Sequence, residues 1–200
     1  MTTFYLLRHG DKEFMPGNPP LSSQGTKQAE ATAKYLQNKN ITAIFTSKLK
    51  RAQDTAQIIS QVLNLPMYVD ERLKERMNWG DKEGQSFEEF NVEWRKTDKD
   101  RNYKPTPGNS SFETGNNLKL FLDEISKKYN NQTILVITHG GTIGDFLRNV
   151  FKEEDLPFAV NKETNVRYME ILECSITVVE EENSKYILKT INSLNHLRDI

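Results

Sequence analysis

The sequence predicts an α/β fold built on one sheet of mostly parallel strands, and three observations support this. Short apolar runs at residues 5–7 and 134–137 are rich in Leu, Ile and Val, as the buried strands of such sheets are. Helical apolar spacing alternates with further short runs along the chain. The length of 200 residues, 36% of them hydrophobic, suits one core. We expect a single domain over residues 1–200.

The first half of the chain reads as a regular alternation of strands and helices. Gly17 and the two prolines after Asn18 predict an irregular loop over residues 11–21 that follows the first strand. Ser22 is predicted to cap the next helix, whose apolar face includes Ala29, Ala33 and Leu36. The elements predicted after it are a strand over 41–46, a helix over 49–63 that ends before Pro66, and a short strand over 67–69.

The segment from residue 72 to residue 115 has a looser pattern. Glycines and prolines interrupt it at Gly80, Gly84, Pro105, Pro107, Gly108 and Gly115. We predict an irregular, lid-like excursion folded over the sheet edge, with one helix near residues 86–96. Charged residues dominate positions 93–104, and for this run a solvated loop is also a reasonable interpretation.

The last part of the chain returns to regular patterns. Apolar spacing predicts a helix over residues 118–129, before the second apolar run, and another over 142–151 after it. Residues 166–179 and 186–191 are predicted to be two strands that flank a Glu-Asn-Ser-Lys turn.

Composition excludes several classes of function. The net charge of −1 gives no general attraction to nucleic acid or to an anionic membrane, so neither is expected as a partner. The single cysteine, Cys174, cannot form an intramolecular disulfide and fits a reducing compartment; we expect it to be a small buried side chain. A strand near the N-terminus leaves no room for a signal peptide, and no apolar run could span a bilayer, so we expect a cytoplasmic protein.

The first functional signal is a histidine at the end of each of the two apolar runs. His9 is followed by Gly10, and His139 is followed by Gly140 and Gly141. In α/β sheets ligands bind outside the carboxyl ends of the strands, so both histidines are expected at the ligand-binding edge. Two of only three histidines in the chain occupy these positions.

The second signal is the placement of the basic residues. Arg8 precedes His9, and Lys48, Lys50 and Arg51 lie where a helix begins. Cations are unfavourable there because the helix dipole already presents positive charge, unless that end faces an anion. For the two lysines we favour a solvated turn, whereas for Arg51 both interpretations remain open. The glycine turn after His139 leads into a helix and also predicts an anion site.

Histidines, arginines and glycine amides together indicate phosphoryl transfer. Its transition state spreads negative charge over three oxygens, which guanidinium groups match. A neutral imidazole near cations is a competent nucleophile, and the reaction then needs an acid for the leaving oxygen and a base for water. The glycines match neither a dinucleotide fingerprint nor a P-loop, which indicates an anion that is smaller than a nucleotide pyrophosphate or is bound without such a loop.

Five ordered blocks resemble the signatures of the histidine phosphatase superfamily, the phosphoglycerate mutase-like group. They are Leu-Arg-His-Gly at 7–10 with Pro-Leu-Ser-Ser-Gln-Gly at 20–25, Ser-Lys-Leu-Lys-Arg-Ala-Gln-Asp-Thr-Ala at 47–56, Arg-Leu-Lys-Glu-Arg at 72–76 with Trp-Gly at 79–80, Thr-His-Gly-Gly at 138–141, and Asn192 with His196 and Leu197. The resemblance covers nearly the whole chain. It implies a three-layer α/β/α sandwich of the phosphoglycerate mutase-like type.

The resemblance also implies a role for each matching residue. His9 would be the phosphorylated nucleophile, and Arg8, Arg51 and His139 would bind the phosphate together with Gly140. Glu75 would protonate the leaving group and then serve as the base for water. No metal or other cofactor is implied. Without the resemblance Glu75 would not stand out, because it lies among other surface-type glutamates, and His196 is expected to be structural.

Departures from the family pattern favour a phosphatase acting on a small phosphate monoester. Asp11 replaces a more usual Glu or Gln, residues 12–18 lack the Trp-Asn pair of mutases, and Pro-Gly-Asn-Ser at 107–110 replaces Pro-Gly-Gly-Glu-Ser. The alternatives are a mutase or sugar bisphosphatase, a phosphate-binding regulator without turnover, and, weakest, a metal hydrolase. Lys82, Arg95 and Arg101 either reach a second anionic group of the substrate or face solvent. The sequence does not indicate the oligomeric state.

Overall fold

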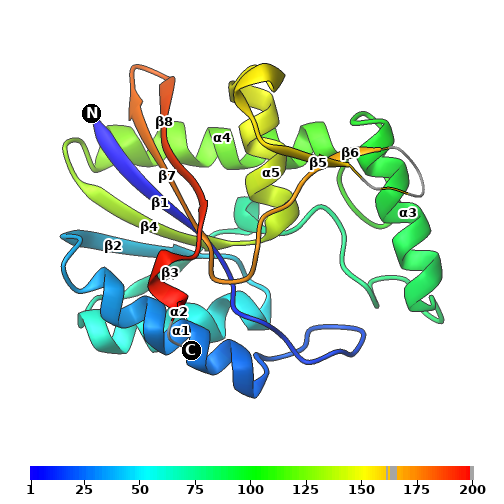
Figure 1. The fold of residues 1–200 in the computed structure, drawn as a ribbon, viewed down its shortest axis with the longest axis horizontal. Helices are drawn as coiled ribbons and strands as arrows, with labels where there is room; N and C mark the ends of the chain where they lie inside the picture. The colour runs from blue at the N-terminus through cyan, green and yellow to red at the C-terminus, as the bar shows by residue number, and fades with distance from the viewer. Residues whose placement is uncertain (161, 163–165, 199–200) are drawn as a thin grey trace.

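Six strands form the central sheet, in the order β3-β2-β4-β1-β7-β8 (Figure 1). The structure is a computed structural model that describes residues 1–160, 162 and 166–198. The strands of this sheet are β1 (Thr2–Arg8), β2 (Ile41–Thr46), β3 (Met67–Val69), β4 (Thr133–Thr138), β7 (Ile176–Glu182) and β8 (Lys185–Ser193). The helices are α1 (Ser23–Leu36), α2 (Lys50–Leu63), α3 (Phe87–Lys99), α4 (Ser111–Lys128) and α5 (Gly140–Val150), with single 3-10 turns at Glu71–Leu73, Glu153–Asp155 and Asn195–Leu197.

The topology places a change of direction at the centre of the sheet. The chain passes from β1 outward to β2 and β3, then returns to insert β4 between β1 and β2; these four strands are parallel. β7 runs antiparallel to β1, and β8 antiparallel to β7. In open α/β sheets the point where strand order reverses is the usual ligand site, and here it lies between β1 and β4.

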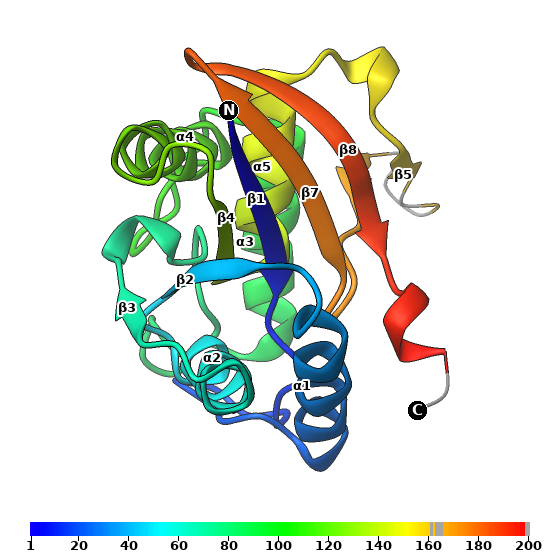
Figure 2. The ribbon, with the colours of Figure 1, turned by 90° about the vertical axis from the view of Figure 1, so that its left-hand side faces the viewer.

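Helices cover both faces of the sheet, as Figure 2 shows. Adjacent residues of β1 and β4 point to opposite faces. Leu7 and Ile137 are buried in one core cluster with apolar residues of α1 and α2. Leu6 and Val136 belong to the second cluster, with apolar residues of α4 and α5. This double burial explains why both strands read as continuous apolar runs, and the predicted three-layer α/β/α sandwich around a mostly parallel sheet is confirmed.

Several local predictions are confirmed in detail. The Ser22 side chain accepts a hydrogen bond from the Gly25 amide at the start of α1. Ser86 begins α3 with a capping box, close to the predicted start at residue 86. Asn183 and Ser184 form the predicted turn between β7 and β8. Cys174 is fully buried. No helix among residues 1–160 and 166–198 is long and apolar enough to cross a membrane.

The predicted extent of the irregular segment is wrong at its C-terminal end. α4 begins at Ser111 rather than near residue 118, because Ser110 and Glu113 form a capping box that starts the helix earlier. Gly115 therefore lies inside a helix, where its lack of a side chain allows the Asp145 carbonyl group of α5 to approach closely. α5 likewise begins at Gly140, two residues before its predicted start.

The strand predicted over residues 166–179 is also wrong. Only β6 (Arg167–Met169) and β7 are extended, and β6 pairs with the short strand β5 (Phe158–Val160) in a separate two-stranded sheet. Between them the chain turns at Cys174, whose φ is +52°. The Cys174 amide donates to the Arg8 carbonyl at 3.1 Å, so the connection crosses the carboxyl end of β1.

Candidate active site

Strand register brings the two predicted histidines together. Arg8 at the end of β1 pairs with Thr138 at the end of β4, so that the next residue of each strand is a histidine. The His9 amide donates to the Thr138 carbonyl at 3.0 Å, and the centroids of the two imidazole rings are 5.1 Å apart. Both side chains are buried, at the carboxyl edge of the sheet where the sequence predicted them.

The loop after β1 is fixed by α1 and α2. The Gly10 amide donates to Thr55 Oγ1 at 3.1 Å, and the Asp11 amide donates to Gln28 Oε1 at 2.8 Å. A Cβ atom on Gly10 would lie 2.6 Å from the Gly25 carbonyl oxygen, and one on Gly25 would lie 1.9 Å from the Asp11 carbonyl oxygen. This close approach needs glycine at both positions, which explains why the first block joins two distant sequence segments.

His9 is held in one neutral tautomer. Its Nδ1–H donates to the Gly10 carbonyl at 2.7 Å, which leaves the lone pair on Nε2, and Nε2 accepts from Arg51 Nε at 3.0 Å. Burial, reinforced by the nearby Arg51 and Arg8, holds the pKa of His9 well below its ordinary value of 6.5. The imidazole is therefore uncharged at neutral pH, with a nucleophilic nitrogen directed at the basic side chains.

Arg51 lies at the start of α2, against His9. Its Nη1 donates to Asn78 Oδ1 at 3.1 Å, and burial lowers the pKa of the guanidinium to about 10, so the group remains charged at neutral pH. The position of Arg51 against His9 thus supports the interpretation that this residue faces a bound anion. Lys48 and Lys50 instead form exposed ion pairs with Glu71 and Asp54, in agreement with the solvated turn that we favoured for them.

His139 lies behind His9 rather than on the cavity surface. Its Nε2 is hydrogen bonded to Ser47 Oγ at 2.8 Å, and burial, with Arg51 next in effect, lowers its pKa well below 6.5. Its Nδ1 has no hydrogen-bond partner among residues 1–160, 162 and 166–198. Ser47 belongs to the second sequence block, so that block contributes both Arg51 and the contact to the second histidine.

Glu75 is buried with its carboxylate at the N-terminus of α5. Oε2 accepts from the Gly141 amide at 2.9 Å, and Oε1 accepts from the Arg76 amide at 3.0 Å and from Thr142 Oγ1 at 3.3 Å. The helix end that the sequence predicted as an anion site therefore holds a carboxylate of the protein itself. Gly140 borders the cavity, and its role towards phosphate stays a prediction.

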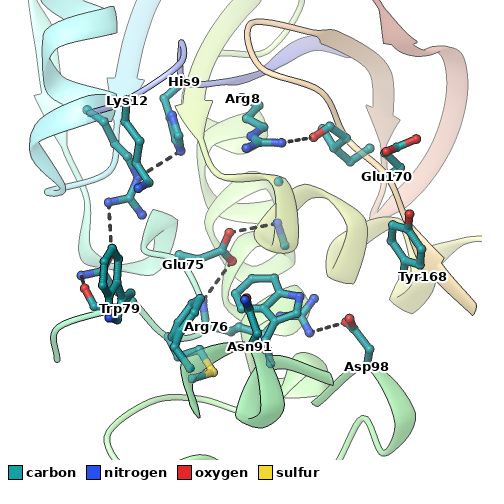
Figure 3. A pocket seen from close by; sticks show the side chains of 18 of the residues that line it. Arg8, His9, Lys12, Glu75, Arg76, Trp79, Asn91, Asp98, Tyr168 and Glu170 are labelled. Atoms are coloured by element: carbon teal, nitrogen blue, oxygen red, sulfur yellow. Dashed lines mark hydrogen bonds and ion pairs between the residues drawn. The ribbon is translucent and has the colours of Figure 1, made fainter. Parts of the chain in front are cut away.

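These groups surround a cavity of about 390 Å³, a size typical of small-molecule sites. Figure 3 shows Lys12 beside His9 and, facing them, the Glu75 carboxylate. Arg8 lines the same cavity, but its guanidinium donates to the Ile171 carbonyl and pairs with Glu173. Of the predicted residues, all but His139 therefore reach the cavity surface.

Sequence reasoning missed several polar residues of this cavity, and two of them, Lys12 and Asn78, lie near Arg51. Lys12 is half-buried, makes no ion pair with any residue that the structure describes, and borders the cavity near Arg51. Asn78 orients Arg51. Asn78 follows Glu75 by three residues, and Lys12 follows His9 by three, so proximity to the recognised blocks was the available signal. The described part of the chain shows no cluster of three or more potential metal ligands.

Comparison with known proteins gives consistent matches over the whole chain. A family model described as "Histidine phosphatase superfamily (branch 1)" matches residues 4–194. A protein of Proteus mirabilis named "Probable phosphoglycerate mutase GpmB" is 28% identical, with 100% of this chain and 97% of the relative covered. "Uncharacterized phosphatase PhoE" of Bacillus subtilis is 27% identical, with 98% and 97% covered.

A solved structure supports the same fold. It is a mycobacterial glucosyl-3-phosphoglycerate phosphatase, which superposes with a TM-score of 0.77 at 22% identity and covers 96% of this chain and 98% of its own.

Proposed function

Because the chain belongs to the histidine phosphatase superfamily, we propose that it hydrolyses a small phosphate monoester without a metal, through a phosphohistidine at His9. The observation that carries this proposal is the state of His9. A neutral imidazole with its Nε2 lone pair directed at Arg51, on the surface of a cavity that Glu75 also borders, has the arrangement of an activated nucleophile.

In the first step His9 Nε2 attacks phosphorus as the bond from phosphorus to the ester oxygen breaks. Protonated Glu75 gives its proton to that oxygen, so that the alcohol leaves neutral. The imidazole then carries the phosphoryl group on Nε2, and the Nδ1–H bond to the Gly10 carbonyl stabilises the positive charge that the ring acquires.

In the second step Glu75, now a carboxylate, takes a proton from water as the water oxygen attacks phosphorus. The bond from phosphorus to nitrogen breaks, the electron pair returns to Nε2, and inorganic phosphate leaves. Glu75 is again protonated and His9 is again neutral. The amide hydrogen bonds from Gly141 and Arg76 hold the carboxylate in place for both transfers.

Three basic side chains border the space that the phosphoryl oxygens would occupy: Arg8, Lys12 and Arg51. Attack requires the Nε2 lone pair, so Arg51 must exchange its hydrogen bond to His9 for one to a phosphate oxygen when substrate binds. Uncatalysed monoester hydrolysis is so slow that accelerations of up to ~10²¹ are known. Preorganised charges in a water-poor cavity are the main source of such stabilisation.

A phosphoglycerate mutase is the second candidate, because a relative that matches the full chain carries that name. A mutase must return the phosphoryl group to a bound alcohol and exclude water, whereas a phosphatase must admit it. The departures from the mutase pattern at residues 12–18 and 107–110 favour the phosphatase.

Hydrolysis of p-nitrophenyl phosphate in excess EDTA tests the proposal, with the wild-type protein and His9→Ala compared side by side. We expect turnover that resists EDTA and is lost in the variant. Turnover that EDTA abolishes, or that His9→Ala retains, would overturn the mechanism. Slow hydrolysis together with rapid phosphoryl exchange between alcohols would identify the mutase.

A further inference from the structure

Aromatic side chains form one side of the cavity. Trp79, Phe87, Phe90 and Trp94, here called the aromatic wall, come from the segment before and within α3. Their rings lie in a continuous row, with centroid distances of 5.1 Å for Trp79–Phe87, 6.2 Å for Phe87–Phe90 and 5.9 Å for Phe90–Trp94. Met15, Met77, Tyr168 and Met169 add further apolar surface to the same cavity.

Contacts within the protein hold the wall in place. Trp79 Nε1 donates to the Gln85 carbonyl at 3.0 Å, so its polar atom is already satisfied within the protein. The Arg76 guanidinium lies 4.2 Å from the Trp94 ring centroid. Phe87 is 40% exposed, although an aromatic ring of this size is stabilised by leaving water. The wall thus presents preordered apolar surface that a ligand could cover.

The charges around the cavity leave little to bind a second anion. Arg76, the basic residue next to the wall, is paired with Asp98 at 2.7 Å and with Asp145 at 3.0 Å. Glu170, at the opposite rim in Figure 3, adds a negative charge. The other basic residues of the described lining, Arg8, Lys12 and Arg51, are those that the proposed phosphate site uses.

The basic residues that the sequence offered for a second anionic group lie elsewhere. Arg95 pairs with Glu88 at 3.3 Å, and Arg101 donates to the Asp145 carbonyl at 3.2 Å and to Ser111 Oγ at 3.1 Å. Lys82 borders a separate cavity together with Tyr103. A substrate carboxylate or second phosphate beside the aromatic wall would therefore lose its water without gaining a cation.

From this geometry we infer that the substrate is a phosphate monoester with one anionic group and an apolar, aromatic leaving group that packs on the aromatic wall. Phosphorylated hydroxy acids and bisphosphates are poor substrates. This inference rests on the proposed function and specifies its substrate class. The inferred substrate also differs from phosphoglycerate, the substrate in the name of the Proteus mirabilis relative.

Three esters of primary alcohols test it, because similar leaving groups remove differences in intrinsic reactivity. They are 2-phenylethyl phosphate, glycerol 3-phosphate and 3-phosphoglycerate. Relative to glycerol 3-phosphate, we expect kcat/KM to be at least about tenfold higher for the phenylethyl ester and at least about tenfold lower for 3-phosphoglycerate. The first ratio measures the effect of the aromatic ring on kcat/KM, and the second measures the effect of the carboxylate.

Paired variants test the assignment to the wall. Phe90→Ala should lower kcat/KM for the phenylethyl ester about tenfold more than it lowers kcat/KM for glycerol 3-phosphate. Phe112→Ala, which removes a 51% exposed phenylalanine that does not line the cavity, should change neither. Asn91→Arg adds a cation to the cavity lining and should raise activity towards 3-phosphoglycerate, whereas Asn91→Gln should not.

The outcomes separate this inference from the proposed function. If none of the three esters nor p-nitrophenyl phosphate is hydrolysed, the proposed function fails and the specificity fails with it. If the esters are hydrolysed but 3-phosphoglycerate equals or exceeds the phenylethyl ester, only the specificity is overturned. Preference for phosphocholine over the phenylethyl ester would also overturn it, since the rings would then serve a cation.

Discussion

At the scale of single residues, the chemistry depends on a neutral His9 with its proton on Nδ1. The chain has only three histidines, so 15N-labelled imidazoles can be followed individually by NMR. Because burial and the nearby arginines lower the pKa of His9, we expect it to stay neutral as the pH falls through 6.5, where a free imidazole is half protonated. Its nitrogen shifts should report the Nδ1–H tautomer. A His9 that titrates near 6.5, or carries its proton on Nε2, would contradict the hydrogen-bond assignment.

Glu75 is the proposed acid, and its importance should depend on the leaving group. Glu75→Gln keeps the shape and the ability to accept the Gly141 amide but cannot give a proton to the leaving oxygen. General acid catalysis contributes about 10²- to 10⁴-fold, so kcat for an alkyl phosphate should fall by about that factor. p-Nitrophenyl phosphate, whose phenolate leaves without a proton, should be affected much less.

The control for this substitution is the conservative variant Glu75→Asp, which retains an acid and should keep part of the leaving-group dependence. Equal slowing of alkyl and p-nitrophenyl esters by Glu75→Gln would count against an acid role.

Residues of the site differ in how far the sequence alone revealed them. His9, His139 and Arg51 were visible because strand ends and a helix start give their positions a physical meaning. Glu75 needed the family resemblance, since a carboxylate in a charged segment carries no local signal. Lys12 and Asn78 were missed because their closeness in the chain to the recognised blocks does not show how the two loops that carry them fold over the cavity.

At the scale of elements, a buried ion network joins α3 to α5 next to Glu75. Arg76 is 4% exposed and pairs with Asp98 from α3 and with Asp145 from α5, while Ser111 Oγ donates to Asp145 at 2.6 Å. Asp145→Ala would leave part of the Arg76 charge buried and unpaired. We expect the free energy of unfolding to fall by about 3–5 kcal/mol in urea titrations.

The matched control breaks an exposed ion pair within α3. Glu88→Ala removes the partner of Arg95, and surface ion pairs contribute only about 0–1 kcal/mol. A loss below about 1 kcal/mol for Asp145→Ala as well would show that the network does not stabilise the fold.

Element prediction succeeded where local signals were complete. β1, β4 and the Ser22 cap of α1 follow from apolar runs and capping chemistry. The prediction of one strand over 166–179 was wrong because the apolar residues of this segment belong to two different sheets. Cys174, at the turn between the two strands, has a left-handed backbone conformation, although cysteine has no preference for turns. The early start of α4 was signalled by the capping box of Ser110 and Glu113, which the apolar spacing alone did not include.

At the scale of the whole molecule, two buried neutral histidines couple stability to pH. The pKa values of His9 and His139 are lowered well below 6.5 in the fold, mainly by burial, whereas in the unfolded chain they are ordinary. Below pH 6.5 the unfolded state therefore binds protons that the folded state does not, and the free energy of unfolding decreases as the pH falls. Each histidine adds up to about 1.4 kcal/mol per pH unit to this slope.

Urea titrations from about pH 5 to 7.5 measure that slope, a range in which ordinary carboxylates are largely ionised. Burial raises the pKa of Asp145 to about 6, so this carboxyl opposes the histidine slope, and the comparison is therefore made between variants that all retain Asp145. His9→Ala and His139→Gln should each reduce the slope by the contribution of the histidine that is replaced. A slope that neither substitution reduces would show that these two histidines do not remain neutral in the fold.

The sheet topology explains why the site forms at all. β4 lies beside β1 although β2 and β3 come between them in the chain, so residues 130 positions apart are neighbours. The sequence predicted the shared edge of the two strands, because parallel strands end together. The position of the 72–115 segment, which supplies the aromatic wall, depends on tertiary contacts such as those of Arg76 and could not be predicted from local pattern.

Trapping the covalent intermediate tests the central claim most directly. The protein is mixed with p-nitrophenyl phosphate, stopped within milliseconds in alkali, where phosphorus–nitrogen bonds survive, then digested and analysed by mass spectrometry. We predict a phosphoryl group on His9 that disappears as substrate is exhausted and never forms in His9→Ala. Phosphate on His139 instead, or steady hydrolysis with no phosphorylated histidine at any time, would contradict the mechanism.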